Sequence, residues 1–180
     1  MNKPCYVAFL RGINVGRAKR IAMADLRVLV EGLGYTGVRS LLNSGNLVFR
    51  ASATAQEAAG AIEEALVLKL GVAARVFVLG REELGAIIDA NPLLGVATDH
   101  ARLIVFLLGE AAQRDKLAAL DSRDWGCERL ALGERAAYVW CPEGMLDSAA
   151  ATSLGKLLGD GTTSRNWNTL LKLHALCGEA

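Results

Sequence analysis

The order of predicted strands and helices occurs twice along the chain, and this repetition restricts the fold more than any other feature of the sequence. Residues 1–95 and 96–180 each follow the order strand, helix, two strands, helix, possible strand, helix. The two halves share no convincing sequence identity. The repeated order favours an α+β protein of two ferredoxin-like (βαββαβ-type) subdomains, 1–95 and 96–180, over a doubly wound parallel sheet. Helices are expected to cover the sheets, and a final helix is expected to close the second subdomain.

The individual elements follow from short apolar runs and from helical spacing of apolar residues. Strands are expected at 5–10, 38–42, 47–49, 74–79, 103–108, 129–132, 137–141 and 162–164. Helices are expected at 26–33, 54–70, 82–90, 111–120, 145–158 and 166–177. The segment 38–49 forms either a hairpin or one long bent strand. Thr54 and Glu57 have the spacing of a capping box, which predicts a helix start at this point.

Composition excludes several classes of protein. Apolar residues make up 52% of the chain, which supplies a core and excludes general disorder. The formal net charge is +1, so no global field attracts nucleic acid or an anionic membrane. The longest apolar stretches, such as 103–108, are far shorter than a membrane span, and the first ten residues do not have the order of a signal peptide. A cytoplasmic protein without a membrane partner is therefore expected.

Cysteine and histidine usage argues against a metal site or a recognisable catalytic motif. The four cysteines are Cys5, Cys127, Cys141 and Cys177. They form no C-x-x-C pair, and no histidine stands at ligand spacing, so no metal or cofactor is expected. All four are expected to be reduced thiols. Neither His100 nor His174 is near a nucleophile motif, since G-x-S-x-G is absent, and no catalytic residue is assigned.

Positive charge is concentrated around the first loop. Residues 11–50 hold seven basic and two acidic side chains, a net charge of +5. The segment 11–20, which we name the basic loop, joins a predicted strand to a predicted helix, where backbone amides and the helix dipole attract anions. Its candidate ligand-binding residues are Arg11, Gly12, Asn14, Gly16 and Lys19. The loop matches neither the P-loop nor the dinucleotide fingerprint, and a solvated basic turn remains the alternative.

Two further polar clusters stand beyond the basic loop. Their candidate ligand-binding residues are Ser44, Gly45 and Asn46 in the first, and Arg165, Asn166 and Asn168 in the second. The structural alternative for the second cluster is that Thr163 or Ser164 caps the last helix. A cation such as Arg165 in a first helical turn opposes the dipole, and a nearby anion would resolve that conflict. A group of acidic residues at 121, 124 and 128 is expected to be a solvated loop.

Four motifs in this order resemble a known family: residues 6–16, 23–26, 44–49 and 163–169. Together they resemble the bacterial domain-of-unknown-function 1697 family, essentially from end to end. The chain has Arg17 where the family commonly has a second glycine after Gly16. The resemblance implies an α+β protein with ferredoxin-like subdomains and no particular activity. The signature positions that it carries over are Arg11, Gly12, Asn14, Gly16, Asp25, Ser44, Gly45, Asn46, Arg165, Asn166, Trp167 and Asn168.

Three functional hypotheses of different classes follow from these observations. The first is a protein that binds a small phosphate- or carboxylate-bearing molecule in a cleft lined by Arg, Asn and Ser side chains. The second is an enzyme of unknown reaction that uses the same cleft. The third is a nucleic-acid-binding ferredoxin-like module, which aromatic residues at 6% and a local basic excess do not favour. If there is one site, Arg11 and Arg165 should converge on it.

Overall fold

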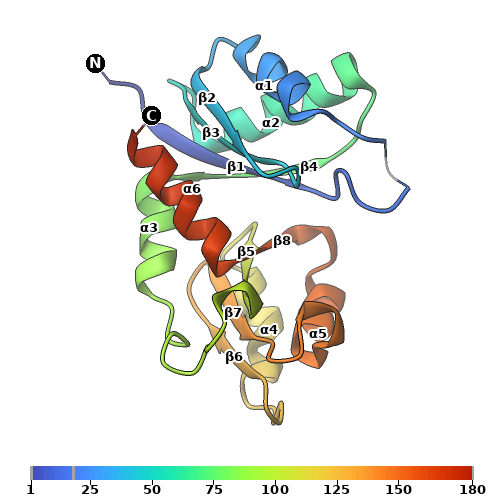
Figure 1. Ribbon diagram of the computed structural model, residues 1–180, viewed down its shortest axis with the longest axis vertical. Helices are drawn as coiled ribbons and strands as arrows, with labels where there is room; N and C mark the ends of the chain where they lie inside the picture. Colours follow the sequence, from blue (N-terminus) through green and yellow to red (C-terminus); the bar gives the residue numbers. More distant parts are fainter. Residues whose placement is uncertain (1, 18, 180) are drawn as a thin grey trace. The chain divides into compact units, whose positions relative to one another are not determined.

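The computed structural model describes residues 2–17 and 19–179 and divides into two compact units (Figure 1). The first unit comprises Met1–Gly85 and Lys172–Ala180, and the second comprises Ala86–Leu171. The division falls inside helix α3 (Arg81–Asp89) and inside helix α6 (Trp167–Glu179). The last residues of the chain therefore group with the first half of the sequence.

The first unit is a four-stranded antiparallel sheet with helices on one face. Its elements are β1 (Cys5–Arg11), α1 (Met23–Glu31), β2 (Thr36–Leu41), β3 (Asn46–Arg50), α2 (Ala55–Ala65), a π-helical turn (Leu66–Leu70) and β4 (Arg75–Gly80). The strand order is β2-β3-β1-β4, and every neighbouring pair is antiparallel. Both α1 and α2 lie on the same face of this sheet (Figure 1).

Alternation along the strands creates the core under α1 and α2. In β1, Ala8 and Leu10 face the helices, and in β3, Leu47 and Phe49 do so. All four side chains are almost fully buried. Helix α2 begins with the expected capping box, in which the hydroxyl of residue 54 accepts from a backbone amide and the Glu57 carboxylate accepts in return. This local signal and the strand pattern are both confirmed.

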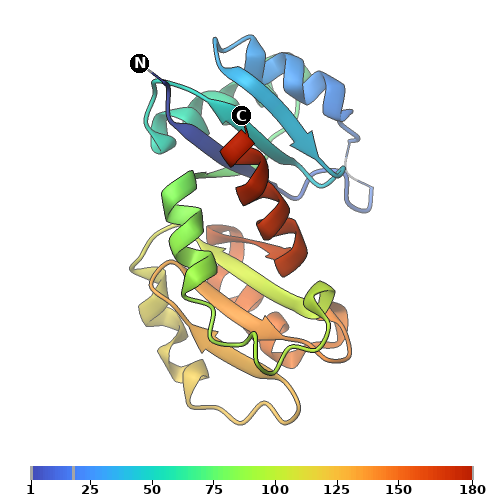
Figure 2. The ribbon, with the colours of Figure 1, turned by 60° about the vertical axis from the view of Figure 1, so that its left-hand side comes forward.

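The second unit has the same kind of sheet. Its elements are β5 (Leu103–Leu108), α4 (Gln113–Asp121), β6 (Arg129–Leu132), β7 (Ala136–Trp140), α5 (Ala149–Leu158) and β8 (Thr162–Asn166). The strand order is β6-β7-β5-β8, again antiparallel throughout. Helices α4 and α5 pack on one face of this sheet (Figures 1 and 2). The expectation of a mixed protein with two helix-covered antiparallel sheets is confirmed.

The structure decides one open alternative and corrects two expected helix starts. Residues 38–49 form a hairpin, β2 and β3, rather than one bent strand. Helix α5 begins at Ala149 because the Ser148 side chain accepts from the Ala151 amide, and residues 145–147 form a short 3-10 turn instead. Helix α6 begins after Asn166, whose side chain accepts from the Thr169 amide at 2.9 Å. Asn166 is therefore the cap, and not Thr163 or Ser164.

The expectation of four free cysteines is wrong for two of them. Cys5 and Cys177 form a disulfide with their Cα atoms 5.9 Å apart, although 172 positions separate them in the sequence. Spacing gave no sign of this pair because only the packing of α6 beside the start of β1 brings the two residues together. Cys127 and Cys141 are free, the first exposed and the second buried. The disulfide thus attaches the end of α6 to the first residue of β1.

Candidate functional site

The basic loop after β1 has an alternating backbone. Gly12, Asn14 and Gly16 adopt φ values of 74°, 56° and 55°, while Ile13 and Val15 between them stay outside the left-handed region. A Cβ at either glycine would meet nothing within 4 Å, so glycine is needed there for its φ and not for space. Among the described residues, the amides at positions 12, 13, 15 and 16 donate no backbone hydrogen bond. Where left-handed residues alternate with right-handed ones, successive amides can form a concavity that favours an anion.

The side chain of Asn14 holds this loop in place. Its Oδ1 accepts from the Ile21 amide at 2.7 Å, and its Nδ2 donates to the Ile21 carbonyl at 2.9 Å. Nδ2 also donates to the carbonyl of Asn43 at 2.9 Å. The loop is therefore tied both to the chain before α1 and to the turn between β2 and β3. Asn14, expected as a ligand-binding residue, uses its polar side-chain atoms to position the loop.

The turn of residues 42–45, here named the Asn43 turn, closes the β2-β3 hairpin beside the basic loop. Gly45 has φ 82°, and a Cβ there would lie 2.7 Å from Cβ of Leu10, so both conformation and space require glycine. Its carbonyl accepts from the Leu10 amide at 2.8 Å. Asn46 is fully buried, and its Nδ2 donates to the Leu41 carbonyl and to Oγ of Ser44. Gly45 and Asn46 therefore define the turn, while Ser44 is exposed at its surface.

Three cations of the basic loop have no acidic partner among the residues that the structure describes. Lys19 donates from Nζ to the Leu70 carbonyl at 2.6 Å, at the end of the helix that continues α2. Arg20 donates from Nη1 to the Asn14 carbonyl at 2.5 Å, and Arg17 is exposed. Within residues 2–17 and 19–179, no carboxylate forms an ion pair with any of these three cations. The carbonyl groups that accept from Lys19 and Arg20 carry no formal charge, so they do not neutralise these two cations.

A further pair of cations lies at the end of the first strand. In the register of β1 and β4, Arg11 is directly opposite Arg75. Directly opposed residues of an antiparallel pair share one face of the sheet, and like charges in that position are destabilising. The Arg75 guanidinium also lies 6.0 Å from the ring centroid of Phe77, which partly accommodates its charge. Positive charge therefore accumulates where β1 enters the basic loop.

The third sequence cluster belongs to the second unit. Arg165 lies in β8 opposite Val105 of β5, and not in the first turn of a helix as expected. Its Nη1 donates to Oγ1 of Thr163 at 2.8 Å and to the Ser164 carbonyl at 2.7 Å. Burial lowers the pKa of Arg165 to about 10. Asn168, in the first turn of α6, is exposed.

The polar clusters therefore divide between the two units. The basic loop and the Asn43 turn meet in the first unit through the Asn14 side chain. The cluster of Arg165, Asn166 and Asn168 belongs to the second. A shared site for Arg11 and Arg165 stays a prediction.

Sequence reasoning missed one polar arrangement in the second unit. A cavity of about 110 Å³ is lined by Cys127, Glu128, Cys141, Pro142, Glu143, Gly144, Asp147 and Ser148. Glu128 is not part of a solvated acidic loop as expected: its carboxylate accepts from the Ser148 hydroxyl and from the Ala149 amide, at the start of α5. Burial raises the pKa of the Cys141 thiol. No local signal connects Glu128 with a helix start 21 residues later.

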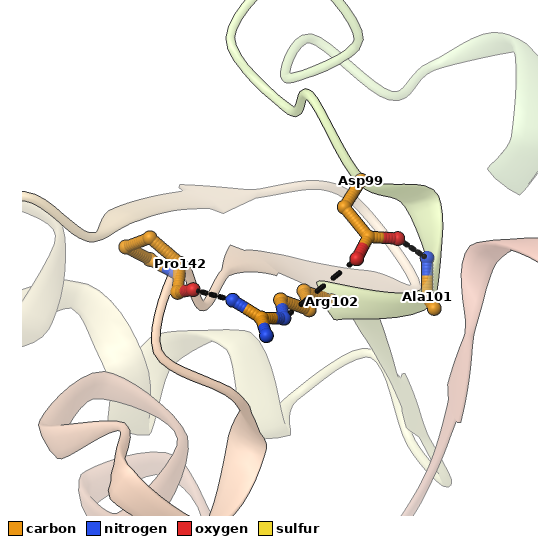
Figure 3. A network of polar contacts seen from close by, with 4 residues as sticks. All are labelled: Asp99, Ala101, Arg102 and Pro142. Atoms are coloured by element: carbon orange, nitrogen blue, oxygen red, sulfur yellow. Dashed lines mark hydrogen bonds and ion pairs between the residues drawn. The ribbon is translucent and has the colours of Figure 1, made fainter.

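A polar network holds Pro142, one of the residues that line this cavity (Figure 3). Asp99 accepts from the Ala101 amide at 2.9 Å and forms an ion pair of 3.7 Å with Nε of Arg102. Arg102 in turn donates from Nη1 to the Pro142 carbonyl. About half of each charged side chain is exposed, so the ion pair adds little stability. The main effect of the network is to hold the chain at Pro142.

The described residues offer neither a metal-binding cluster nor a membrane-spanning helix. In the part of the chain that the structure describes, no group of three or more His, Cys, Asp or Glu side chains is arranged to hold a metal ion. None of the described helices is long and apolar enough to cross a bilayer. The polar features that stand out are the cationic loop of the first unit and the small cavity of the second.

Fold and site together define a two-unit α+β protein whose first strand runs into a basic, glycine-containing loop. Residues 3–138 match the model of the proteins of unknown function DUF1697, and the chain belongs to this family, as its motifs indicate. The conserved bacterial protein SP0830 from Streptococcus pneumoniae has a similar fold, with a TM-score of 0.79 and 24% identity over 97% of this chain and 98% of that one. No curated protein matches the sequence.

Proposed function

We propose that this protein binds a small phosphate- or carboxylate-bearing molecule at the basic loop. The observation that supports this most strongly is the group of three cations, Arg17, Lys19 and Arg20, without a carboxylate partner among the described residues. The segment 11–24 contains no acidic residue at all. Cations on one short loop repel one another, and an anion bound among them lowers that repulsion.

The backbone supports the same reading. The amides of Gly12, Ile13, Val15 and Gly16 are available as donors, and hydrogen bonds from amides to an anion are charge-assisted. In the proposed complex these amides bind the anion's oxygens, while Arg17 supplies a guanidinium that can bind a phosphate or carboxylate with two parallel hydrogen bonds. The role of Asn14 is to keep the loop in this conformation before the ligand arrives. An ordered loop reduces the entropy lost on binding.

The cluster of Arg165, Asn166 and Asn168 enters the proposal separately. Arg165 lies in β8, which pairs with β5, and its guanidinium is partly desolvated. A partly desolvated cation forms strong charge-assisted hydrogen bonds to an anionic ligand. Its contribution is testable by itself, because substitution of Arg165 leaves the basic loop intact. We also propose that each unit is ferredoxin-like, which the element order β, α, β, β, α, β and the sheet orders β2-β3-β1-β4 and β6-β7-β5-β8 support.

Thermal unfolding in the presence of inorganic phosphate tests the proposal. At 100 times its dissociation constant a ligand adds about 2.7 kcal/mol of stability, and chloride at the same ionic strength controls for general screening. The variant Arg17→Ala should lose most of the phosphate-dependent shift. Arg114→Ala is the matched control, since it removes one exposed arginine from α4 in the other unit.

The possible results distinguish a site at the basic loop, a site at β8 and the absence of phosphate binding. If Arg17→Ala and Arg114→Ala respond to phosphate equally, the basic loop is not the site. If Arg165→Ala alone loses the response, the anion site belongs to β8. If phosphate stabilises the wild type no more than chloride does, the protein does not bind this class of anion.

A further inference from the structure

Two apolar side chains are exposed beside the basic loop. Val15 is 59% exposed within the loop, and Leu42 is 58% exposed in the Asn43 turn. Each is next in sequence to one partner of the hydrogen bond that joins the two segments, from Asn14 to the Asn43 carbonyl. The two exposed side chains therefore belong to segments that this hydrogen bond joins, and one of these segments is the basic loop with its cations. Single exposed apolar residues are common, but two on neighbouring short turns next to a cationic loop are a specific arrangement.

Leu42 combines an exposed side chain with an unfavourable backbone conformation, and the stability of the fold does not account for this combination. Leu42 has φ 59°, a conformation that costs a bulky residue energy and that turns usually give to glycine or asparagine. A buried leucine would regain that energy through the hydrophobic effect. Leu42 remains exposed, so the folded protein by itself gains little from this side chain. A ligand that covers it would supply the missing burial.

We propose that the anion bound at the basic loop carries an alkyl or aryl group, which packs on Val15 and Leu42. This inference rests on the proposed function and adds the class of ligand: an amphipathic phosphate or carboxylate rather than a free inorganic anion. The charged end is bound by the loop amides and by Arg17. The apolar end covers two side chains that otherwise contact water. A soluble molecule suits this surface better than a bilayer, because two side chains bury less apolar area than stable membrane attachment requires.

Calorimetric titration with inorganic phosphate, methyl phosphate, butyl phosphate and hexyl phosphate tests this inference at constant ionic strength. Each methylene that becomes buried should strengthen binding up to about fourfold, until the apolar surface is covered. The change from methyl to butyl phosphate should therefore improve affinity by about tenfold or more. Inorganic phosphate measures the contribution of the charge alone.

Two variants identify the residues responsible. Leu42→Asn should keep the affinity for inorganic phosphate and lose much of the dependence on alkyl length. Val15→Ser, which retains the backbone amide of the loop, should lose the same dependence. Asparagine tolerates a positive φ, so Leu42→Asn preserves the turn. The matched control is Val28→Ser, which removes another apolar side chain, 66% exposed, from α1. The control should retain the full dependence on alkyl length.

Each outcome decides the inference. Stronger binding with longer chains, lost in the two variants and kept in the control, supports it. Phosphate binding that does not depend on chain length overturns it and leaves the proposed function standing. Absence of binding by every phosphate overturns both. Binding to vesicles of anionic phospholipid, without binding to soluble alkyl phosphates, overturns the inference in favour of a lipid surface.

Discussion

Removal of the Cys5–Cys177 disulfide should strongly destabilise the protein. The bond closes a loop of 172 residues, and in the chain-entropy model a loop of this length restricts the unfolded state by about 5 kcal/mol at 25 °C. If the second unit remained folded while the first unfolded, the effective loop would be about half as long, and the figure would fall by only about 0.6 kcal/mol. For a chain of this size, about 5 kcal/mol corresponds to a melting temperature lower by about 10–20 °C.

Urea unfolding with and without dithiothreitol measures this effect. Oxidised wild type should have the higher midpoint, and reduction should lower it to that of the Cys177→Ala variant, which should not respond to dithiothreitol. The reduced unfolded state is more expanded, so the slope of the unfolding free energy with urea should also increase on reduction. Cys127→Ala is the control, since Cys127 is exposed and free, and it should behave as wild type in both conditions.

Two results would refute this reasoning. Titration in denaturant should find two reactive thiols in protein purified without reductant, belonging to Cys127 and Cys141. Four reactive thiols would mean that the bond between Cys5 and Cys177 does not form. Two thiols together with a midpoint that reduction leaves unchanged would mean that closing the loop contributes nothing to stability.

Two further predictions concern the first unit. Gly45→Ala should destabilise the protein by about 2–4 kcal/mol in urea unfolding, because the new Cβ would lie 2.7 Å from Cβ of Leu10 at a φ of 82°. Gly12→Ala, with open space around the new Cβ, should cost only about 1–2 kcal/mol. Equal losses in the two variants would contradict the packing argument. The backbone amide of Thr54, and then its hydroxyl, hold the pKa of Glu57 below its ordinary value. The Glu57 carboxylate therefore stabilises the fold above its unfolded-state pKa, and this stabilisation is lost as pH falls through its folded-state pKa. Glu57→Gln should reduce the fall of the urea midpoint below about pH 4.5. An acid profile identical to that of the wild type would disprove this role of Glu57.

The secondary structure could be predicted because its signals are local. The capping box at Thr54 and Glu57 is complete within four residues, and the apolar run of β5 needs no distant partner to be recognised as a strand. The disulfide could not be predicted, since its two cysteines meet only after the chain has folded. Glu128 was similarly misjudged, because the helix start that it stabilises lies 21 residues further on.

The sequence singled out residues of the candidate site but not the contacts that they make. The motifs drew attention to Asn14, Gly45 and Asn46 as special positions. Contacts then show that Asn14 anchors the loop across 29 residues, and that Gly45 and Asn46 shape a turn. Val15 and Leu42 were overlooked, because an apolar side chain in a loop carries no signal of its exposure in the sequence. Their significance depends on accessibility and on a positive φ, which only the folded chain provides.

The Cys5–Cys177 bond has a topological consequence: residues 5–177 form a covalent ring. Cleavage of one peptide bond within that ring opens it without separating the pieces. A protease that cuts once at an exposed loop therefore leaves a product that keeps the mass of the intact chain until a reductant is added. Nicked molecules would stay assembled, and electrophoresis with and without reductant would reveal the ring directly.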